Sequence, residues 1–384
     1  MDRSSFATTS RGVIRRTLEG YDAFYPERLP RVIGYSSLTV KRLEEAVAGV
    51  HRLAGASRLI PDPMVLLGPY VRLEAVLSSR IEGTEATVHD LLKFEADDDA
   101  RGDVREVWNY QRALDHGMKR LVDFPLSLRL IREMHAILLD GVRGGHQAPG
   151  EFRKTQNWIG APGCTLTTAT FVPPPPEELG ALLADLERFL HEDDLPALVT
   201  LALAHYQFEA IHPFLDGNGR IGRLLVPLVC AARGILRWPM LYVSAYFEEH
   251  RSAYYDRLLA VSRTGDFGPW LDFFLTAIAV QARDAEERAV RLVDLQRSLR
   301  EGLLASRASV NAVRLAETLL SQPYLTAAMA QRFLEVTNPT AQKAIRALED
   351  RGILVEVTGQ SRYRIWQAPS IIDAVYGEQL TGSA

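Results

Sequence analysis

Apolar residues recur at helical intervals along most of this 384-residue chain. In residues 69–82, and again in residues 103–142, they return every three or four positions, which places them on one face of a helix. Residues 198–211 and 221–233 are apolar and helix-forming almost throughout, so two buried helices are expected there. Helical patterns continue through residues 267–301. The chain is therefore predicted to be mainly α.

Three other segments depart from the helical pattern. Residues 149–171 alternate in character and contain glycine turns, which predicts a short β-hairpin. The four prolines of residues 173–176 then predict a stiff, extended connector. Residues 1–36 are polar and punctuated by proline, so an extended stretch is expected around Tyr25.

The C-terminal part, residues 309–366, has three helical patterns followed by two short strand patterns that meet at Thr358 and Gly359. The third helix is predicted from Pro339 to Arg351, with Asn338 as its N-cap. Three helices and a two-stranded hairpin resemble a winged helix-turn-helix. Its third helix presents the polar residues Gln342, Lys343 and Arg346.

These positions suit a DNA groove, but the same segment carries seven basic and five acidic residues, a net charge of only +2. Protein contact or dimerisation is therefore a slightly better interpretation of this domain than DNA binding. Three domains are expected: an N-terminal arm over residues 1–100, a core over 101–300, and the winged helix over 301–384.

Charge and composition narrow the class of protein. The net charge of −4 gives no general basic field for nucleic acid. Two cysteines, Cys164 and Cys230, make neither a disulfide framework nor a zinc spacing. No apolar run is long enough to span a membrane, and no signal-peptide core is evident near the start. A cytoplasmic protein without membrane partners is expected.

Residues 212–223 read His-Pro-Phe-Leu-Asp-Gly-Asn-Gly-Arg-Ile-Gly-Arg, between the two apolar helices. The start of a helix has free N–H groups and partial positive charge, and glycines let a phosphate approach them closely. Arg220 and Arg223 share one face of the second helix and suit phosphate. Asp216 is an oxygen ligand suited to Mg²⁺, and the imidazole of His212 can accept a proton near neutral pH.

The same twelve residues match, at every fixed position, the signature of the Fic family, which the chain resembles over about residues 20–290. The resemblance implies transfer of AMP from ATP to a Tyr, Thr or Ser hydroxyl of a protein, with the chain itself as one target. His212 would be the base and Asp216 would hold Mg²⁺. Gly217, Asn218 and Gly219 would form an anion hole, while Arg220 and Arg223 would bind phosphates. The Gly219–Arg220 step favours adenylyl over phosphoryl transfer.

Residues 78–83, Ser-Ser-Arg-Ile-Glu-Gly, end the predicted helix of residues 69–82. They resemble the inhibitory motif of a Fic subgroup, which implies that Glu82 pairs with Arg223 and that Ser78 helps to hold the helix. A guanidinium that is paired with a carboxylate cannot also make a bidentate contact with a phosphate. In some relatives this glutamate also positions water for the removal of AMP, so the reverse reaction is a second expected activity.

The resemblance further implies that the hairpin of residues 149–171 is a flap, which registers a target by strand addition. It also implies an adenosine pocket downstream, for which Tyr255 is the best candidate. His250 stands where many relatives carry Asn, which leaves the adenine contacts open. A second class of function, a DNA-binding regulator with the Fic core as sensor, stays as the alternative. The intact motif favours the enzyme. Oligomeric state stays open, with a homodimer among the expected partners.

Overall fold

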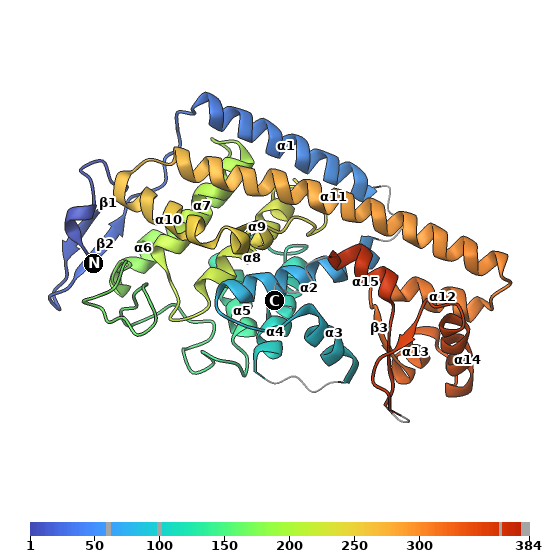
Figure 1. The fold of residues 1–384 in the computed structure, drawn as a ribbon. Coiled ribbons are helices and arrows are strands. Elements are labelled where there is room, and N and C mark those ends of the chain that lie inside the picture. The colour runs from blue at the N-terminus through green and yellow to red at the C-terminus, as the bar shows by residue number, and fades with distance from the viewer. Residues whose placement is uncertain (59–62, 98–101, 361–362, 378–384) are drawn as a thin grey trace.

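The computed structural model describes residues 1–384 except 59–62, 98–101, 361–362 and 378–384, and helices dominate it (Figure 1). The centre is an antiparallel pair formed by α7 (Ala197–Ile211) and α8 (Asn218–Ala232). Nearly every residue of both helices is buried, as their uniformly apolar sequences require. Around this pair pack α4 (Asp103–Arg120), α5 (Leu128–Leu138) and α6 (Leu179–His191). The mainly α prediction is confirmed.

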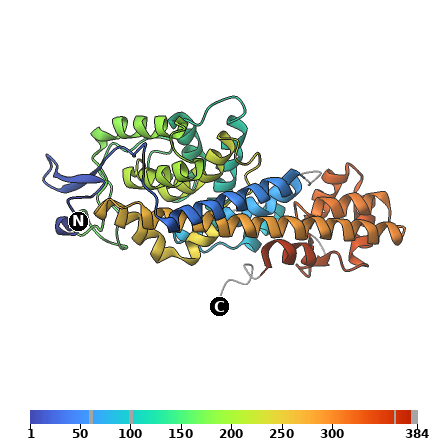
Figure 2. The same ribbon diagram turned by 90° about the horizontal axis from the view of Figure 1, so that it is seen from above.

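Two long helices brace this core. Helix α11 (Gly268–Ala305) runs the length of the molecule, and α1 (Ser37–Arg58) lies beside it in both views (Figures 1 and 2). Between α8 and α11 lie the short α9 (Ser244–Glu249) and α10 (Arg251–Thr264). Helix α11 continues without a break through residue 301, where the third domain was expected to begin. The other expected boundary, at residue 100, lies outside the described residues.

The N-terminal segment contains more regular structure than expected. After the 3₁₀ turn η1 (Arg3–Ser5), β1 (Gly12–Arg16) pairs antiparallel with β2 (Asp22–Pro26), from Gly12 opposite Pro26 to Arg16 opposite Asp22. The extended stretch expected around Tyr25 is therefore confirmed, and its pairing with β1 is an addition that the sequence did not predict. The backbone N–H of Phe24 also donates to the carbonyl of Val172, which ties this hairpin to the flap segment.

The flap is less regular than predicted. Residues 149–171 form turns, and antiparallel pairing is limited to one bridge between Ile159 and Phe171. The proline segment then leads into the 3₁₀ turn η2 (Pro176–Glu178) and α6. The physical reason is that side chains hold this segment instead: Gln156 donates to the carbonyls of Asn157 and Pro173.

Helix α2 (Pro63–Ile81) starts earlier than the predicted residue 69 and contains Pro69 in its interior. A short loop with Gly83 at a φ of +91° and α3 (Val88–Asp97) follow it. Within the residues that the structure describes, no helix combines the length and apolar character needed to cross a bilayer.

The C-terminal domain consists of α12 (Val310–Leu319), α13 (Ala327–Leu334), α14 (Asn338–Glu349) and a small sheet. The sheet contains the predicted pair, β4 (Val355–Glu356) and β5 (Ile365–Gln367), and also β3 (Tyr324–Thr326), in the order β3–β5–β4. The N-cap of α14 is Thr337, so the prediction of Asn338 as the cap was wrong by one residue. Helix α15 (Pro369–Tyr376) closes the domain against α11 and α2.

This domain is attached directly to α2. The buried guanidinium of Arg72 donates to the carbonyl of Ser321 at 2.8 Å and to the side chain of Gln322 at 2.5 Å. The ring of His89 on α3 also lies within hydrogen-bond distance of the hydroxyl of Tyr324. The helix that ends at the site described next is therefore held near its middle by the C-terminal domain.

Candidate functional site

The turn between α7 and α8 carries the residues singled out in the sequence. Helix α7 ends because His212 adopts a φ of +49°, and α8 begins after Gly217, at a φ of +78°. Left-handed backbone of this kind favours glycine and is costly elsewhere. The first turn of α8, at residues 218–220, thus directs its unpaired N–H groups outward.

The side chain of Asn218 closes the turn. Its Oδ1 accepts the N–H of Phe214 at 2.8 Å, and its Nδ2 donates to the carbonyl of the same residue at 2.8 Å. Phe214 is fully buried. The side chain of Asn218 is therefore fully used in shaping the loop, and only its backbone is free for an anion. The N–H of Gly217 is taken by Asp216 Oδ1 at 2.6 Å.

His135 on α5 packs against the turn between α7 and α8. Its ring stacks on Phe214, with centroids 3.7 Å apart and planes 7° apart. The N–H of Gly150 donates to its Nδ1, so the proton lies on Nε2, which donates to the carbonyl of Asp216 at 2.9 Å. Burial lowers the pKa of His135 to about 4, which keeps the ring neutral for this role.

The flap segment holds the backbone of His212. Arg153 Nε donates to the carbonyl of His212 at 2.9 Å, and Asn157 donates to the same carbonyl at 3.1 Å. The Nδ1 of His212 lies 3.3 Å from the carbonyl of Glu209, which leaves Nε2 as the proton-accepting atom. Burial, followed by the charge of Arg153, lowers the pKa of His212 to about 4, so the ring is neutral near pH 7.

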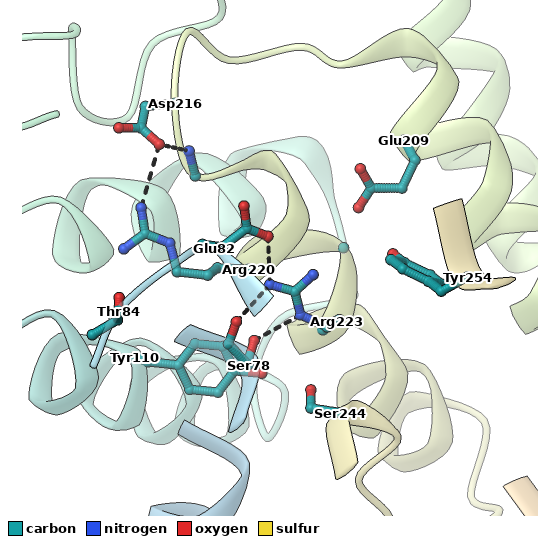
Figure 3. Close-up of polar contacts among 12 residues, drawn as sticks. Ser78, Glu82, Thr84, Tyr110, Glu209, Asp216, Arg220, Arg223, Ser244 and Tyr254 are labelled. Atoms are coloured by element: carbon teal, nitrogen blue, oxygen red, sulfur yellow. Dashed lines mark hydrogen bonds and ion pairs between the residues drawn. The ribbon is translucent and has the colours of Figure 1, made fainter. Parts of the chain in front are cut away.

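The two arginines on α8 are both buried and have different carboxylate partners (Figure 3). Arg220 donates to Glu106 on α4 at 3.2 Å and to Asp216 at 3.4 Å. Glu106 is itself buried and also accepts from Thr84 at 3.4 Å. Asp216 remains one-third exposed. A single accessible carboxylate beside a phosphate site fits Mg²⁺, which commonly takes one or two carboxylates together with phosphate oxygens.

Arg223 binds the end of α2. Its Nε donates to Ser78 Oγ at 2.8 Å, and its Nη2 donates to the carbonyl of Ser78 at 2.9 Å and to Glu82 Oε1 at 2.7 Å (Figure 3). A Cβ atom on Gly219 would collide with Glu82 Oε1, so the carboxylate lies directly on the first turn of α8. Burial raises the pKa of Glu82, but the attraction of Arg223 outweighs it, so the net pKa is lowered and Glu82 is ionised.

Glu74, Ser78 and Glu82 are spaced four residues apart, which puts them on the same side of α2 as it faces the core. Glu74 is buried and accepts from the hydroxyls of Ser244 at 2.5 Å and Tyr110 at 3.0 Å. Burial raises its pKa to about 7. This polar stripe fixes the register of α2 against α4, α8 and α9.

Tyr255 lies on α10 and its side chain is 41% exposed, while the neighbouring Tyr254 is buried and hydrogen-bonded to His205 at 2.8 Å. The ring of His250 stacks on Tyr246, with centroids 4.2 Å apart. Tyr255 therefore has an accessible ring, and the side chain of His250 is exposed to a similar extent. Among the described residues, no cluster of three His, Cys, Asp or Glu side chains is placed to hold a metal by itself.

The structure also assembles residues that the sequence did not single out as functional. These are Glu106, His135, Arg153, Asn157 and Glu209, each in contact with a motif residue. His135 and Glu209 lie within helical patterns, and their only local signal was a polar residue in an apolar segment.

Three family models match separate parts of the chain. The Fic/DOC family N-terminal model matches residues 40–119, the Fic/DOC family model residues 125–230, and a model described as HTH DNA binding domain residues 313–368. The motif and its partner glutamate thus lie within the two Fic matches.

The chain is also similar to proteins named protein adenylyltransferase Fic. That of Drosophila grimshawi is 34% identical over 154 residues, which are 38% of this chain and 28% of the relative. That of Drosophila melanogaster is 33% identical over 154 residues, 38% of this chain and 27% of the relative. The chain thus spans less than a third of either relative's length.

Two solved structures share the fold. A Fic family protein from Desulfovibrio desulfuricans has a TM-score of 0.56 and 19% identity, covering 88% of this chain and 98% of its own. A Fic domain containing signaling protein from Bacteroides thetaiotaomicron has a TM-score of 0.50 and 21% identity, covering 65% of this chain and 96% of its own. With the intact motif on the turn between α7 and α8, the chain contains a Fic/DOC family N-terminal domain and a Fic/DOC family domain, followed by a C-terminal helix-turn-helix domain.

Proposed function

We propose that this protein is an adenylyltransferase that moves AMP from ATP to a hydroxyl group of a protein. The observation that carries the proposal is the arrangement of His212, at the end of α7, with Asp216, Arg220 and Arg223 at and after the start of α8. Figure 3 shows the last three of these residues. A helix start with free N–H groups, two guanidiniums and a carboxylate suits a nucleoside triphosphate with its cation. The relatives named protein adenylyltransferase Fic point to the same chemistry.

Each residue then has a distinct task. Asp216 would hold Mg²⁺ against the phosphates, and the backbone N–H groups of Gly217, Asn218 and Gly219 would donate to their oxygens. Arg220 would bind phosphate from its fixed position between Glu106 and Asp216, and Arg223 would bind the γ-phosphate. Tyr255 would border the adenosine. Mg²⁺ would supply charge neutralisation of the leaving pyrophosphate.

His212 takes the proton of the target hydroxyl on Nε2 while the hydroxyl oxygen attacks the α-phosphorus. The bond from that phosphorus to pyrophosphate breaks, and pyrophosphate leaves with the electron pair. A neutral imidazole with its Nδ1 side held by a carbonyl is prepared for this proton transfer.

The chain in this conformation is autoinhibited. Arg223 donates to both Ser78 and Glu82, and Glu82 lies on the helix start that a phosphate would use. ATP therefore competes with Glu82 for one guanidinium and one anion site. Release of α2 from Arg223 would be the activating step, and the same glutamate would orient a water for removal of AMP.

The test is intact-mass analysis of the full chain after incubation with ATP and Mg²⁺, in wild type and in Glu82→Gly. A gain of one AMP group in Glu82→Gly supports adenylyl transfer to the chain itself, and a gain of one phosphate overturns it in favour of phosphoryl transfer. For transfer to other proteins, the Glu82→Gly chain and ATP labelled on its α-phosphate are incubated with a cell lysate. Absence of AMP transfer in both assays overturns the proposal.

A second function, DNA binding, is favoured by the match of residues 313–368 to a DNA-binding domain model. On α14, Lys343 and Arg346 are exposed and Gln342 is half-buried. Reversing both charges, Lys343→Glu with Arg346→Glu, is expected to weaken binding to duplex DNA by about tenfold or more, since each lost base contact costs roughly 1–3 kcal/mol. Gel shift at fixed salt measures it.

The matched control reverses two exposed lysines elsewhere, Lys41→Glu with Lys119→Glu, which changes the net charge equally. Equal loss in both double variants would mean that DNA responds only to net charge. No DNA binding by the wild type would leave the domain with the role of a protein contact, as its low net charge also suggests.

A further inference from the structure

One carboxyl group beside His212 has no task in the mechanism above. Glu209 lies on the last turn of α7, three residues before His212, and its side chain is only 12% exposed. Its Oε2 lies 3.9 Å from His212 Nδ1. Its Oε1 is buried and has no hydrogen-bond partner within the described part of the chain. A buried polar atom without a hydrogen-bond partner lowers the stability of the fold by roughly 1–3 kcal/mol, so a functional role for this carboxyl group has to be considered.

The space for this carboxyl group is made by a glycine of the motif. A Cβ atom on Gly222 would collide with Glu209 Oε1, so any larger residue at position 222 would displace the side chain. Arg223 follows directly, and in Figure 3 its guanidinium lies between Glu82 on one side and Glu209 on the other. Glu209 is thus part of the site, although within the described part of the chain its carboxyl group makes no hydrogen bond to the proposed phosphate-binding turn.

The chemistry at His212 needs a nearby negative charge. When Nε2 takes a proton, the ring becomes a buried cation whose second proton is on Nδ1. The carbonyl of Glu209 accepts from that side at 3.3 Å but carries no net charge. Among the described residues, Glu209 is the acidic side chain within ion-pair distance of the ring. A carboxylate there stabilises the imidazolium and keeps the ring in the correct tautomer, as in other hydroxyl–histidine–carboxylate arrangements.

We infer that Glu209 is a positioning residue for His212, whose carboxylate holds the Nδ1–H side of the ring and balances the charge that forms during adenylyl transfer. This role rests on the proposed function. It predicts that the reactive form of the enzyme is the one in which Glu209 is ionised.

Glu209 is expected to ionise within the pH range in which the enzyme can be assayed. The charged or titratable groups that face it are His212, Arg223 on α8, Glu82 beyond α2 and Tyr254 on α10. Burial raises the pKa of Glu209 to about 8; Arg223 opposes this shift and Glu82 adds to it. Below that pKa the carboxyl group is neutral and gives no compensation, so the rate must rise with pH. In Glu82→Gly the midpoint should lie lower, because one cause of the raised pKa is absent.

The experiment compares Glu82→Gly with Glu82→Gly, Glu209→Gln. Initial rates of AMP gain are followed by intact mass from about pH 6 to about pH 9, at saturating ATP and Mg²⁺. In the parent, the rate is expected to rise about tenfold per pH unit below the midpoint, as loss of one proton requires. In the glutamine variant that rise disappears. The two rates should converge at low pH, where a protonated carboxyl and an amide are alike.

A merely structural role gives a different result: Glu209→Gln would then lower the rate by one factor at every pH, with a lower melting temperature or weaker ATP binding. That outcome, or an unchanged pH profile, overturns the inference. Glu209→Asp, which keeps the acid, should retain the rising limb. If the parent transfers no AMP, the proposed function is what fails.

NMR then tests the contact without activity. In the wild-type chain, the ¹⁵N shift of His212 Nδ1, assigned by comparison with His212→Ala, should move as pH rises through the ionisation of Glu209. The shift should stay constant over that range in Glu209→Gln. A titration that is the same in both chains would show that the carboxyl group does not act on the ring.

Discussion

Replacing Glu82 with glycine is expected to raise the rate of AMP transfer by about 5- to 150-fold, the range typical of a coupling free energy of 1–3 kcal/mol. The reason is local: Arg223 Nη2 now donates to Glu82 at 2.7 Å, and the carboxylate lies against Gly219 at the start of α8. Without it, both the guanidinium and the helix start become available to phosphate. Initial rates and the Kd for ATP measure the effect, and ATP should bind more tightly.

The matched control is Glu85→Gly, the same substitution three residues later in the same loop, at an exposed side chain. It should leave transfer near the wild-type level. Equal activation by both substitutions would mean that loosening the loop, rather than freeing Arg223, is what activates. Unchanged activity in Glu82→Gly would assign the contact between α2 and Arg223 a structural role only.

Release of this contact involves more than one ion pair. Ser78 also accepts from Arg223, Glu74 is held by Ser244 and Tyr110, and Arg72 is held by the C-terminal domain. Glu82 is the most exposed of these groups and lies at the end of the helix. Opening of the last turn of α2 is therefore the least costly route to a free Arg223, with the rest of the helix in place.

The sequence predicted those elements of the fold whose pattern lies within one short stretch of residues. Helices α7 and α8 were expected because their apolar residues are contiguous, and the turn between them because glycine and proline interrupt both patterns. The start of α2 was missed because Pro69 reads as a helix start, whereas here it lies within the helix. Strand β3 was missed because its partner, β5, lies about forty residues later and three residues carry little pattern.

The same distinction applies to the site: residues close together in sequence could be predicted, and their partners from distant helices could not. His212, Asp216 and the two arginines are close in sequence, so one segment revealed them together. Their partners come from elsewhere: Glu106 reaches Arg220 from α4, and His135 reaches the turn from α5. Nothing in the spacing of a lone buried Glu or His distinguishes such a partner from an ordinary core residue, because the signal is the tertiary contact itself.

Replacing His212 with alanine in the Glu82→Gly background is expected to lower AMP transfer by about 10²- to 10⁴-fold, the usual contribution of a general base. ATP binding should persist, because the hydrogen bonds that hold Arg220, Arg223 and Asp216 in place do not involve the imidazole. Intact mass measures transfer and calorimetry measures binding, so a loss of transfer can be separated from a loss of ATP.

The fold of this variant also has to be considered, because the carbonyl of residue 212 accepts from Arg153 and Asn157 and its backbone is left-handed. Alanine keeps the carbonyl but is strained at a φ of +49°. His212→Asn, which tolerates left-handed backbone better, is therefore the matched variant and should be equally inactive. If either variant retained the full rate, the proton would have to leave through another group. Glu209 would then be the nearest candidate, since its carboxyl group lies 3.9 Å from the present ring.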